Sequence, residues 1–220
     1  MKAHTSRGFT LIEMLTVMAV IAILASLVIA VAGYAQSTAA KERAKGEIAA
    51  LSTACENYKA DNGGYPRAKK TDELDPRKFG NPATGDSGKK YQDASLRLYV
   101  ALSGDSKPDE DHPDGRPEPE QKAYYEFKPE VLDFKKAPDG KIKEINYLKD
   151  PWGNSYGYST AAANAEEEYR SDLRKNPQAT RAATAPGYNP TFDLWSTGGS
   201  TRNAVDGNEQ VDVKKWVKNW

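Results

Sequence analysis

One carboxylate lies inside the most apolar part of the chain. Residues 9–32 span 24 positions, and the polar residues among them are Thr10, Glu13, Thr16 and Ser26. A helix of this length reaches about 36 Å, which is enough to cross a bilayer core of about 30 Å. A carboxylate in such a helix costs a few kcal/mol unless it is protonated, paired or close to the head groups. Glu13 is therefore predicted either to meet a positive charge or to lie shallow at the membrane interface.

A second group of oxygen-bearing residues lies near the carboxyl end. Residues 196–212 contain carboxylates, amides and three glycines, and their side-chain and backbone oxygens are the hard ligands that Ca²⁺ prefers. The spacing of the glycines is not that of an EF-hand loop. The alternative is a loop without metal, held by hydrogen bonds and by the packing of Trp216 and Trp220.

The remaining motifs do not provide a set of residues that could form a catalytic site. Residues 85–88, Gly-Asp-Ser-Gly, are similar to the nucleophile loop of a serine protease, but the only histidine before them is His4, so we expect a flexible turn. The acids and His112 within 109–114 lie among prolines, which favours a solvated loop over a metal site. The single cysteine, Cys55, excludes an intramolecular disulfide and is predicted to be a buried core residue. We predict that the protein is not an enzyme.

The charge of the chain argues against nucleic-acid binding and indicates how the chain is oriented in the membrane. The chain has 220 residues, with 31 Lys and Arg against 31 Asp and Glu, so it lacks the positive field that draws proteins to nucleic acid. The first eight residues hold Lys2 and Arg7 and no acid, which favours a cytoplasmic amino terminus and an external remainder. A cleaved secretory signal is the alternative, since Ala30, Ala32 and Ala35 offer small residues, but it leaves Glu13 unexplained.

The start of the chain resembles a known processing signal. After the basic leader comes Gly8-Phe9-Thr10-Leu11-Ile12-Glu13-Met14, followed by the apolar helix. This stretch resembles the prepilin signature of type IV pilins and of type II secretion pseudopilins. The resemblance implies that a prepilin peptidase cleaves after Gly8 and methylates the new amino terminus at Phe9. It also implies that Glu13 neutralises the Phe9 amine of an adjacent subunit in a helical filament.

Beyond the apolar segment, the pattern predicts a helix that continues into a folded head. An apolar stripe with spacings of 4, 3, 4 and 3 residues would lie on one face of it, and residues 61–66 contain the glycines and proline that end a helix. The stripe consists of Ala44, Ile48, Leu51, Cys55 and Tyr58. Short strands are predicted at 142–145, around 156–158 and at 191–195, with a turn at 150–154 and Trp152 as a core anchor.

These elements predict an α+β fold. A long amino-terminal hydrophobic helix would serve as a transmembrane stalk and pack, through its carboxyl-terminal half, on a small antiparallel sheet. Further helices are predicted at 93–102 and 161–174, and an exposed loop at 107–120. The expected organisation is a leader at 1–8, a transmembrane and polymerisation helix at 9–35, and a periplasmic head at 36–220 with insertions at about 67–140 and 160–190.

Three later segments resemble the major pseudopilin of type II secretion, in the same order along the chain. They are residues 56–66, 149–158 and 192–196. In that family the carboxyl-terminal loop binds calcium, which points to Thr197, Asp206 and Asp212 as ligands here. At the place of the family's earlier aspartate this chain has Gly199 and Ser200, so Asp206 would replace it.

The resemblance implies a structural function in the inner membrane. The chain would be a single-pass subunit of a periplasmic filament that drives protein export through an outer-membrane secretin. Its partners would be further copies of itself, prepilin peptidase, minor pseudopilins, and the inner-membrane assembly platform with its ATPase. The alternatives are a type IV pilin in a surface fibre, serving adhesion, motility or DNA uptake, and a membrane-tethered periplasmic module that never polymerises.

Overall fold

The protein is described by a computed structural model of the whole chain. The structure describes all residues except 1–9, 79–81, 84, 107, 109–120 and 201–212. The chain divides into two compact units, Met1–Ala40 and Lys41–Trp220. Gly8 and Phe9, like Asp206 and Asp212, lie outside the described residues.

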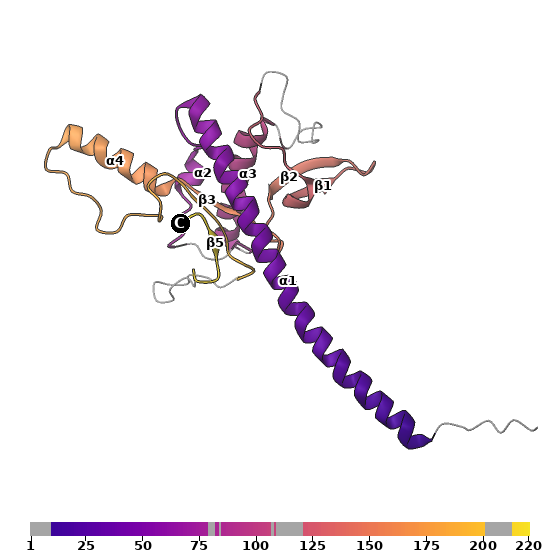
Figure 1. Cartoon of the computed structure of the whole chain (residues 1–220). Coiled ribbons are helices and arrows are strands. Elements are labelled where there is room, and N and C mark those ends of the chain that lie inside the picture. Colours follow the sequence, from indigo (N-terminus) through magenta and orange to yellow (C-terminus); the bar gives the residue numbers. More distant parts are fainter. Residues whose placement is uncertain (1–9, 79–81, 84, 107, 109–120, 201–212) are drawn as a thin grey trace, which may run out of the picture. The chain divides into compact units, whose positions relative to one another are not determined.

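The longest element is helix α1, Leu11–Asn62, which has residues in both units (Figure 1). In the second unit its apolar stripe is buried at Ala44, Ile48, Leu51 and Cys55 and partly buried at Tyr58. The helix ends where the sequence predicts. Gly63 adopts a φ of 76°, which suits a residue without Cβ, and its N–H donates to the Lys59 carbonyl at 2.8 Å.

The remaining elements belong to the second unit. They are α2 (Lys69–Asp72), α3 (Gly85–Ser103), the 3₁₀ helix η1 (Pro129–Val131), β1 (Leu132–Lys136), β2 (Ile142–Leu148), β3 (Gly157–Ser159), α4 (Ala161–Lys175), β4 (Asp193–Ser196) and β5 (Val217–Lys218). Strands β1 and β2 pair as an antiparallel hairpin, and β3, β4 and β5 form a second antiparallel sheet in that order. The α+β prediction is confirmed.

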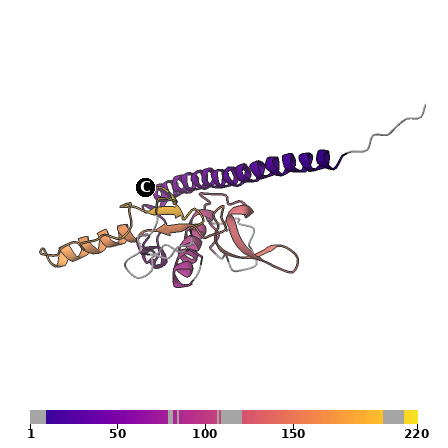
Figure 2. The ribbon, with the colours of Figure 1, turned by 90° about the horizontal axis from the view of Figure 1, so that it is seen from below.

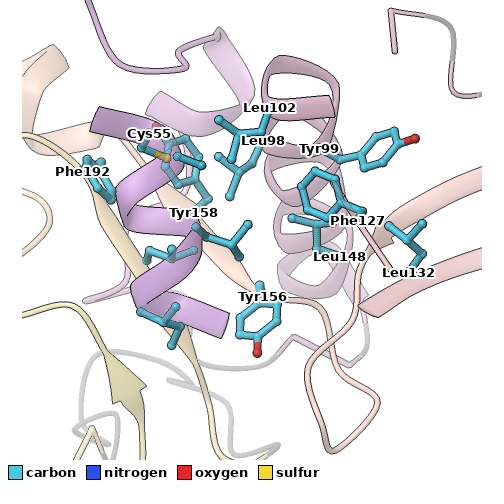
Figure 3. Close-up of a cluster of buried hydrophobic side chains, with 14 of the residues drawn as sticks. Cys55, Leu98, Tyr99, Leu102, Phe127, Leu132, Leu148, Tyr156, Tyr158 and Phe192 are labelled. Carbon is cyan, nitrogen blue, oxygen red and sulfur yellow. The ribbon is translucent and has the colours of Figure 1, made fainter. Parts of the chain in front are cut away.

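The main core lies between the carboxyl-terminal part of α1, the strands and α3. Figure 2 shows strands β3 and β4 between these two helices. Cys55, Tyr158 and Phe192 approach one another, and Leu98 and Leu102 of α3 face them (Figure 3). Each of these side chains is at most 4% exposed, and full burial of an apolar side chain of this size stabilises by about 1.5–3 kcal/mol.

A second core cluster is aromatic. Trp195 of β4 is fully buried, stacks on Trp216 with ring centroids 5.8 Å apart, and donates its Nε1–H to the Tyr91 hydroxyl at 2.9 Å. Gly157 allows this arrangement, because a Cβ there would lie 2.2 Å from the Trp195 ring. Trp152 is partly buried and packs against the main core, as predicted.

One local prediction is wrong. Residues 85–88 form the first turn of α3 rather than a flexible turn. The helix begins earlier than the predicted residue 93 because Tyr91, Ala94 and Leu98 bury one apolar face against the sheet and the Trp195 cluster. Gly85 begins the helix with a φ of 64°, and tertiary packing of the buried face outweighs the low helix propensity of Gly88.

Candidate functional site

The Glu13 carboxylate lies in the first turn of α1 and helps to cap the amino terminus of the helix. Its Oε2 accepts hydrogen bonds from the Thr10 backbone N–H at 2.7 Å and from the Thr10 hydroxyl at 2.8 Å. The Glu13 N–H donates in return to Thr10 Oγ1 at 3.3 Å. This reciprocal pattern is a capping box, which satisfies donors that the first turn leaves free. This cap was not among the sequence predictions, although Thr10 followed three residues later by Glu13 is its usual signal.

The other polar side chains of the apolar segment are satisfied within the helix. Thr16 Oγ1 donates to the Glu13 carbonyl at 2.9 Å, and Ser26 Oγ donates to the Ile23 carbonyl at 2.7 Å. Such local bonds let hydroxyl side chains enter hydrocarbon without an unpaired donor. Glu13 differs from them because it carries a full charge, and no cationic group among the described residues pairs with it. Its negative charge therefore has no compensating charge in the described part of this chain.

The surface around Glu13 is apolar on every side. All residues from 10 to 28 are exposed in the single chain, and the exposed fractions of the large apolar side chains in this range run from 50% at Met14 to 83% at Leu11. Over the described residues, α1 is the one helix that is long and apolar enough to cross a membrane. An apolar surface of this extent requires a cover of lipid or of other protein.

The predicted calcium loop is described only at its two ends. Thr197 follows β4 directly and is fully buried, its carbonyl accepts from the Ser200 N–H at 3.1 Å, and its Oγ1 is a buried oxygen without a hydrogen-bond partner in the described structure. The pairing of Ser196 with Val217 holds the two ends together. The described residues contain no cluster of three or more His, Cys, Asp or Glu that could hold a metal.

A buried aspartate fixes the turn that precedes β3. Asp150 Oδ1 accepts the backbone N–H groups of Trp152 and Asn154 at 3.0 and 2.8 Å, and Oδ2 accepts the Ser196 hydroxyl at 2.5 Å. The predicted turn at 150–154 is thereby confirmed, and Asp150 joins it to β4. Burial raises the pKa of Asp150 above its ordinary value, although these hydrogen bonds act in the opposite direction.

A polar link that was not among the sequence predictions joins α1 to the sheet. The Tyr156 hydroxyl donates to Glu47 Oε2 at 2.5 Å, and Glu47 Oε1 pairs with Arg43 Nε at 2.7 Å. Burial, followed by the Glu47 carboxylate, raises the pKa of Tyr156. Spacing on the helix gave no signal for this link, because its two ends are more than a hundred residues apart.

The amino-terminal segment matches a known family model. Residues 4–29 match the model described as the prokaryotic N-terminal methylation motif. Together with the apolar helix and the α+β unit that follows, this match is consistent with a pilin-like fold that carries a prepilin-type amino terminus.

The chain is also similar to proteins named type II secretion system core protein G. It is 25% identical to core protein G of Pseudomonas aeruginosa over 216 residues, covering 98% of this chain and 99% of the relative. Core protein G of Escherichia coli is 43% identical over 60 residues, which cover 27% of this chain and 41% of the relative. That of Klebsiella michiganensis is 38% identical over 66 residues, covering 30% and 46%. No solved structure matches. The resemblance drawn from the sequence is confirmed.

Proposed function

We propose that the protein is a structural subunit of a type II secretion pseudopilus. The observation that carries this proposal is the Glu13 charge, which no cationic group among the described residues compensates, on a helix whose described residues 10–28 are all exposed and mostly apolar. Association of copies through such helices covers the apolar surface, and it brings the Glu13 carboxylate to a cation supplied by a neighbour. The whole-length similarity to a core protein G supports the same function.

The cation in this proposal is the amino group of Phe9. Cleavage after Gly8 creates that amine four residues before Glu13, and methylation leaves it positively charged. In a medium of low dielectric constant such a pair is strongly favoured over either ion alone. The match of residues 4–29 to the methylation motif supports the processing step.

The proposed location is the inner membrane, with one span, the unprocessed amino terminus in the cytoplasm and the second unit in the periplasm. The partners would be further copies of the chain, prepilin peptidase, minor pseudopilins, the assembly platform with its ATPase, and the outer-membrane secretin. The role is structural: copies of the chain extend a filament, and the filament moves folded proteins through the secretin.

Deletion of the gene in its native host tests the function. We expect a defined set of proteins to disappear from the culture medium and to accumulate in the periplasm, and plasmid-borne wild type to restore their export. Loss of long surface fibres with an unchanged set of exported proteins would instead identify the chain as a type IV pilin. Unchanged export together with an unchanged surface would contradict both.

We further propose that the loop after β4 binds Ca²⁺ through Thr197, Asp206 and Asp212. The buried Thr197 Oγ1, which has no hydrogen-bond partner within the described residues, supports this, because an oxygen ligand in that position suits a hard cation. A bound ion would cross-link the loop to the sheet and stabilise the folded second unit. We expect the thermal midpoint of metal-free protein to rise on addition of Ca²⁺, and Asp212→Ala to remove that rise. An equal midpoint with and without Ca²⁺ would exclude the site.

A further inference from the structure

A cavity of about 550 Å³ lies between α4 and the segment 176–190 that follows it. Both belong to a predicted insertion, and Figure 1 shows the segment returning beside the orange helix. Its volume lies within the range of about 300–1,000 Å³ that is typical of ligand pockets. Neither Glu13 nor the loop after β4 contributes to it.

The charged residues of the cavity wall are three arginines and one acid. The wall contains Arg77, Arg170 and Arg181 and a single carboxylate, that of Glu166, which gives it a net charge of +2. The whole chain has a formal net charge of zero. The excess positive charge is therefore a local property of this cavity, and it favours an anionic ligand.

Two of these guanidinium groups already hold a carboxylate. Glu166 Oε1 accepts from Arg170 Nε at 2.8 Å, and Glu166 Oε2 pairs with Arg181 Nη2 at 2.8 Å. The Arg181 guanidinium also lies 4.9 Å from the centre of the Tyr169 ring. In these contacts two planar guanidinium groups bind a carboxylate of the chain itself. The same geometry suits the carboxylate of a bound ligand.

The third guanidinium forms no salt bridge within the described structure, although its positive charge partly offsets the rise that burial causes in the pKa of Asp193. Arg77 Nε donates to the Gly187 carbonyl at 2.6 Å, and the guanidinium lies 4.6 Å from the centre of the Tyr188 ring. Its terminal nitrogens make no hydrogen bond within the described structure. The Nε hydrogen bond therefore positions Arg77, and within the described structure its Nη1 and Nη2 groups can still donate hydrogen bonds to a ligand.

The cavity wall is anchored to the folded unit, so the site is formed before a ligand arrives. Tyr188 stacks on Trp220 with ring centroids 4.6 Å apart, and the Gly187 N–H donates to Asp75 at 3.1 Å. On the other side, Arg67 binds both Glu167 and Asn164 of α4. A preformed site does not lose the entropy of ordering its wall on binding.

We propose that this cavity binds an acidic peptide segment. Its carboxylates would pair with Arg77 and with the Arg170–Arg181 pair. Apolar parts of the peptide would rest on the non-polar wall, which includes Ala162, Ala185, Pro186 and Pro190. A compact inorganic anion would leave those apolar surfaces uncovered, which is why a peptide fits the mixed wall better.

Peptide binding to the full-length protein in detergent micelles tests the proposal. A suitable probe is a fluorescent synthetic peptide with the sequence of residues 109–120, which contains six acidic residues and one arginine. Its fluorescence anisotropy should rise with protein concentration. A peptide with Asn and Gln in place of the acids should bind at least about tenfold more weakly, because charge-assisted hydrogen bonds are lost.

Four variants separate the cavity from general electrostatics. We expect Arg77→Gln and Arg181→Gln each to weaken binding about tenfold, and Glu166→Gln to tighten it about threefold by removing a competing carboxylate. The matched control is Arg174→Gln, which removes the same charge from α4 outside the cavity wall and should change affinity less than about twofold. Thermal unfolding followed by circular dichroism checks that each variant is folded.

Several results would overturn the proposal. They are no binding of the acidic peptide up to about 1 mM, equal binding of the uncharged peptide, an equal loss in Arg174→Gln and folded Arg77→Gln, and unchanged or weaker binding by Glu166→Gln. Complete displacement of the peptide by inorganic phosphate at a matched concentration would identify a site for compact anions instead.

Discussion

Replacement of Glu13 by glutamine separates the two roles that its carboxylate can have. The structure shows Glu13 in a capping box with Thr10, and the proposed function gives it a charge that pairs with a neighbouring subunit. Glutamine keeps the side-chain oxygen and is itself accepted at this position of a capping box. Glu13→Gln therefore removes the charge and preserves the cap, whereas Thr10→Ala removes the hydroxyl of the cap and preserves the charge.

The two roles predict effects of different size. Loss of an N-cap hydroxyl costs about 1 kcal/mol, and the helix continues through α1 to Asn62, well beyond that turn. Removing one partner of an ion pair buried away from water costs about 3–5 kcal/mol. At about 1.4 kcal/mol for each factor of ten, the affinity between subunits falls by about two to four orders of magnitude in Glu13→Gln and by less than one in Thr10→Ala.

Counting filaments in cells measures this difference. Both variants and the wild type are produced at equal levels, and filaments are labelled with antibody and imaged by electron microscopy. We expect no filaments from Glu13→Gln, filaments from Thr10→Ala, and cleavage after Gly8 in both. Wild-type numbers of filaments from Glu13→Gln would refute the charge-pairing argument, and their loss in Thr10→Ala would assign Glu13 to helix capping alone.

Three further predictions concern the second unit. Gly157→Ala places a Cβ against the buried Trp195 ring and should lower the free energy of unfolding by about 3 kcal/mol. The control Gly46→Ala, on α1 with open space around it, should raise that free energy by about 0.5–1 kcal/mol. Equal thermal midpoints for the two variants would contradict the packing of Gly157 against Trp195. Burial raises the pKa of the Cys55 thiol to about 12, so at pH 8 its reaction with a thiol reagent should be about 10³-fold slower than that of an ordinary thiol and become fast only on unfolding; rapid labelling of folded protein would exclude this. The raised pKa of Asp150 means that its contribution to stability is fully present below its ordinary pKa and is lost as pH rises through the raised pKa; the thermal midpoint of the wild type relative to Asp150→Asn should fall over that range, and a rise would be contradictory.

Features encoded by nearby residues could be predicted from the sequence. The buried stripe on α1 follows from helical spacing, and the end of the helix follows from Gly63. The early start of α3 could not be predicted from residues 85–88, because it depends on packing of Tyr91 against Trp195, which lies more than a hundred residues further on. Helix propensity is a property of one segment, whereas the start of α3 depends on contacts between two segments that are far apart in the sequence.

The candidate site divides in the same way. Glu13 could be recognised because the prepilin-like signature and the apolar helix are contiguous in the sequence. Its cap with Thr10 is also encoded by a local motif. The arginine cavity gave no signal, since Arg77 comes from a different part of the chain than α4 and Tyr188. Only the fold brings those guanidinium groups together.

In the proposed filament, copies of the processed chain associate through the Phe9 amine and Glu13. Mass spectrometry of the protein isolated from its native host tests the chemistry on which this depends. We predict a chain that begins at Phe9 and carries one methyl group on its amino terminus. Recovery of only the full-length chain, with residues 1–8 attached and no methyl group, would contradict the account.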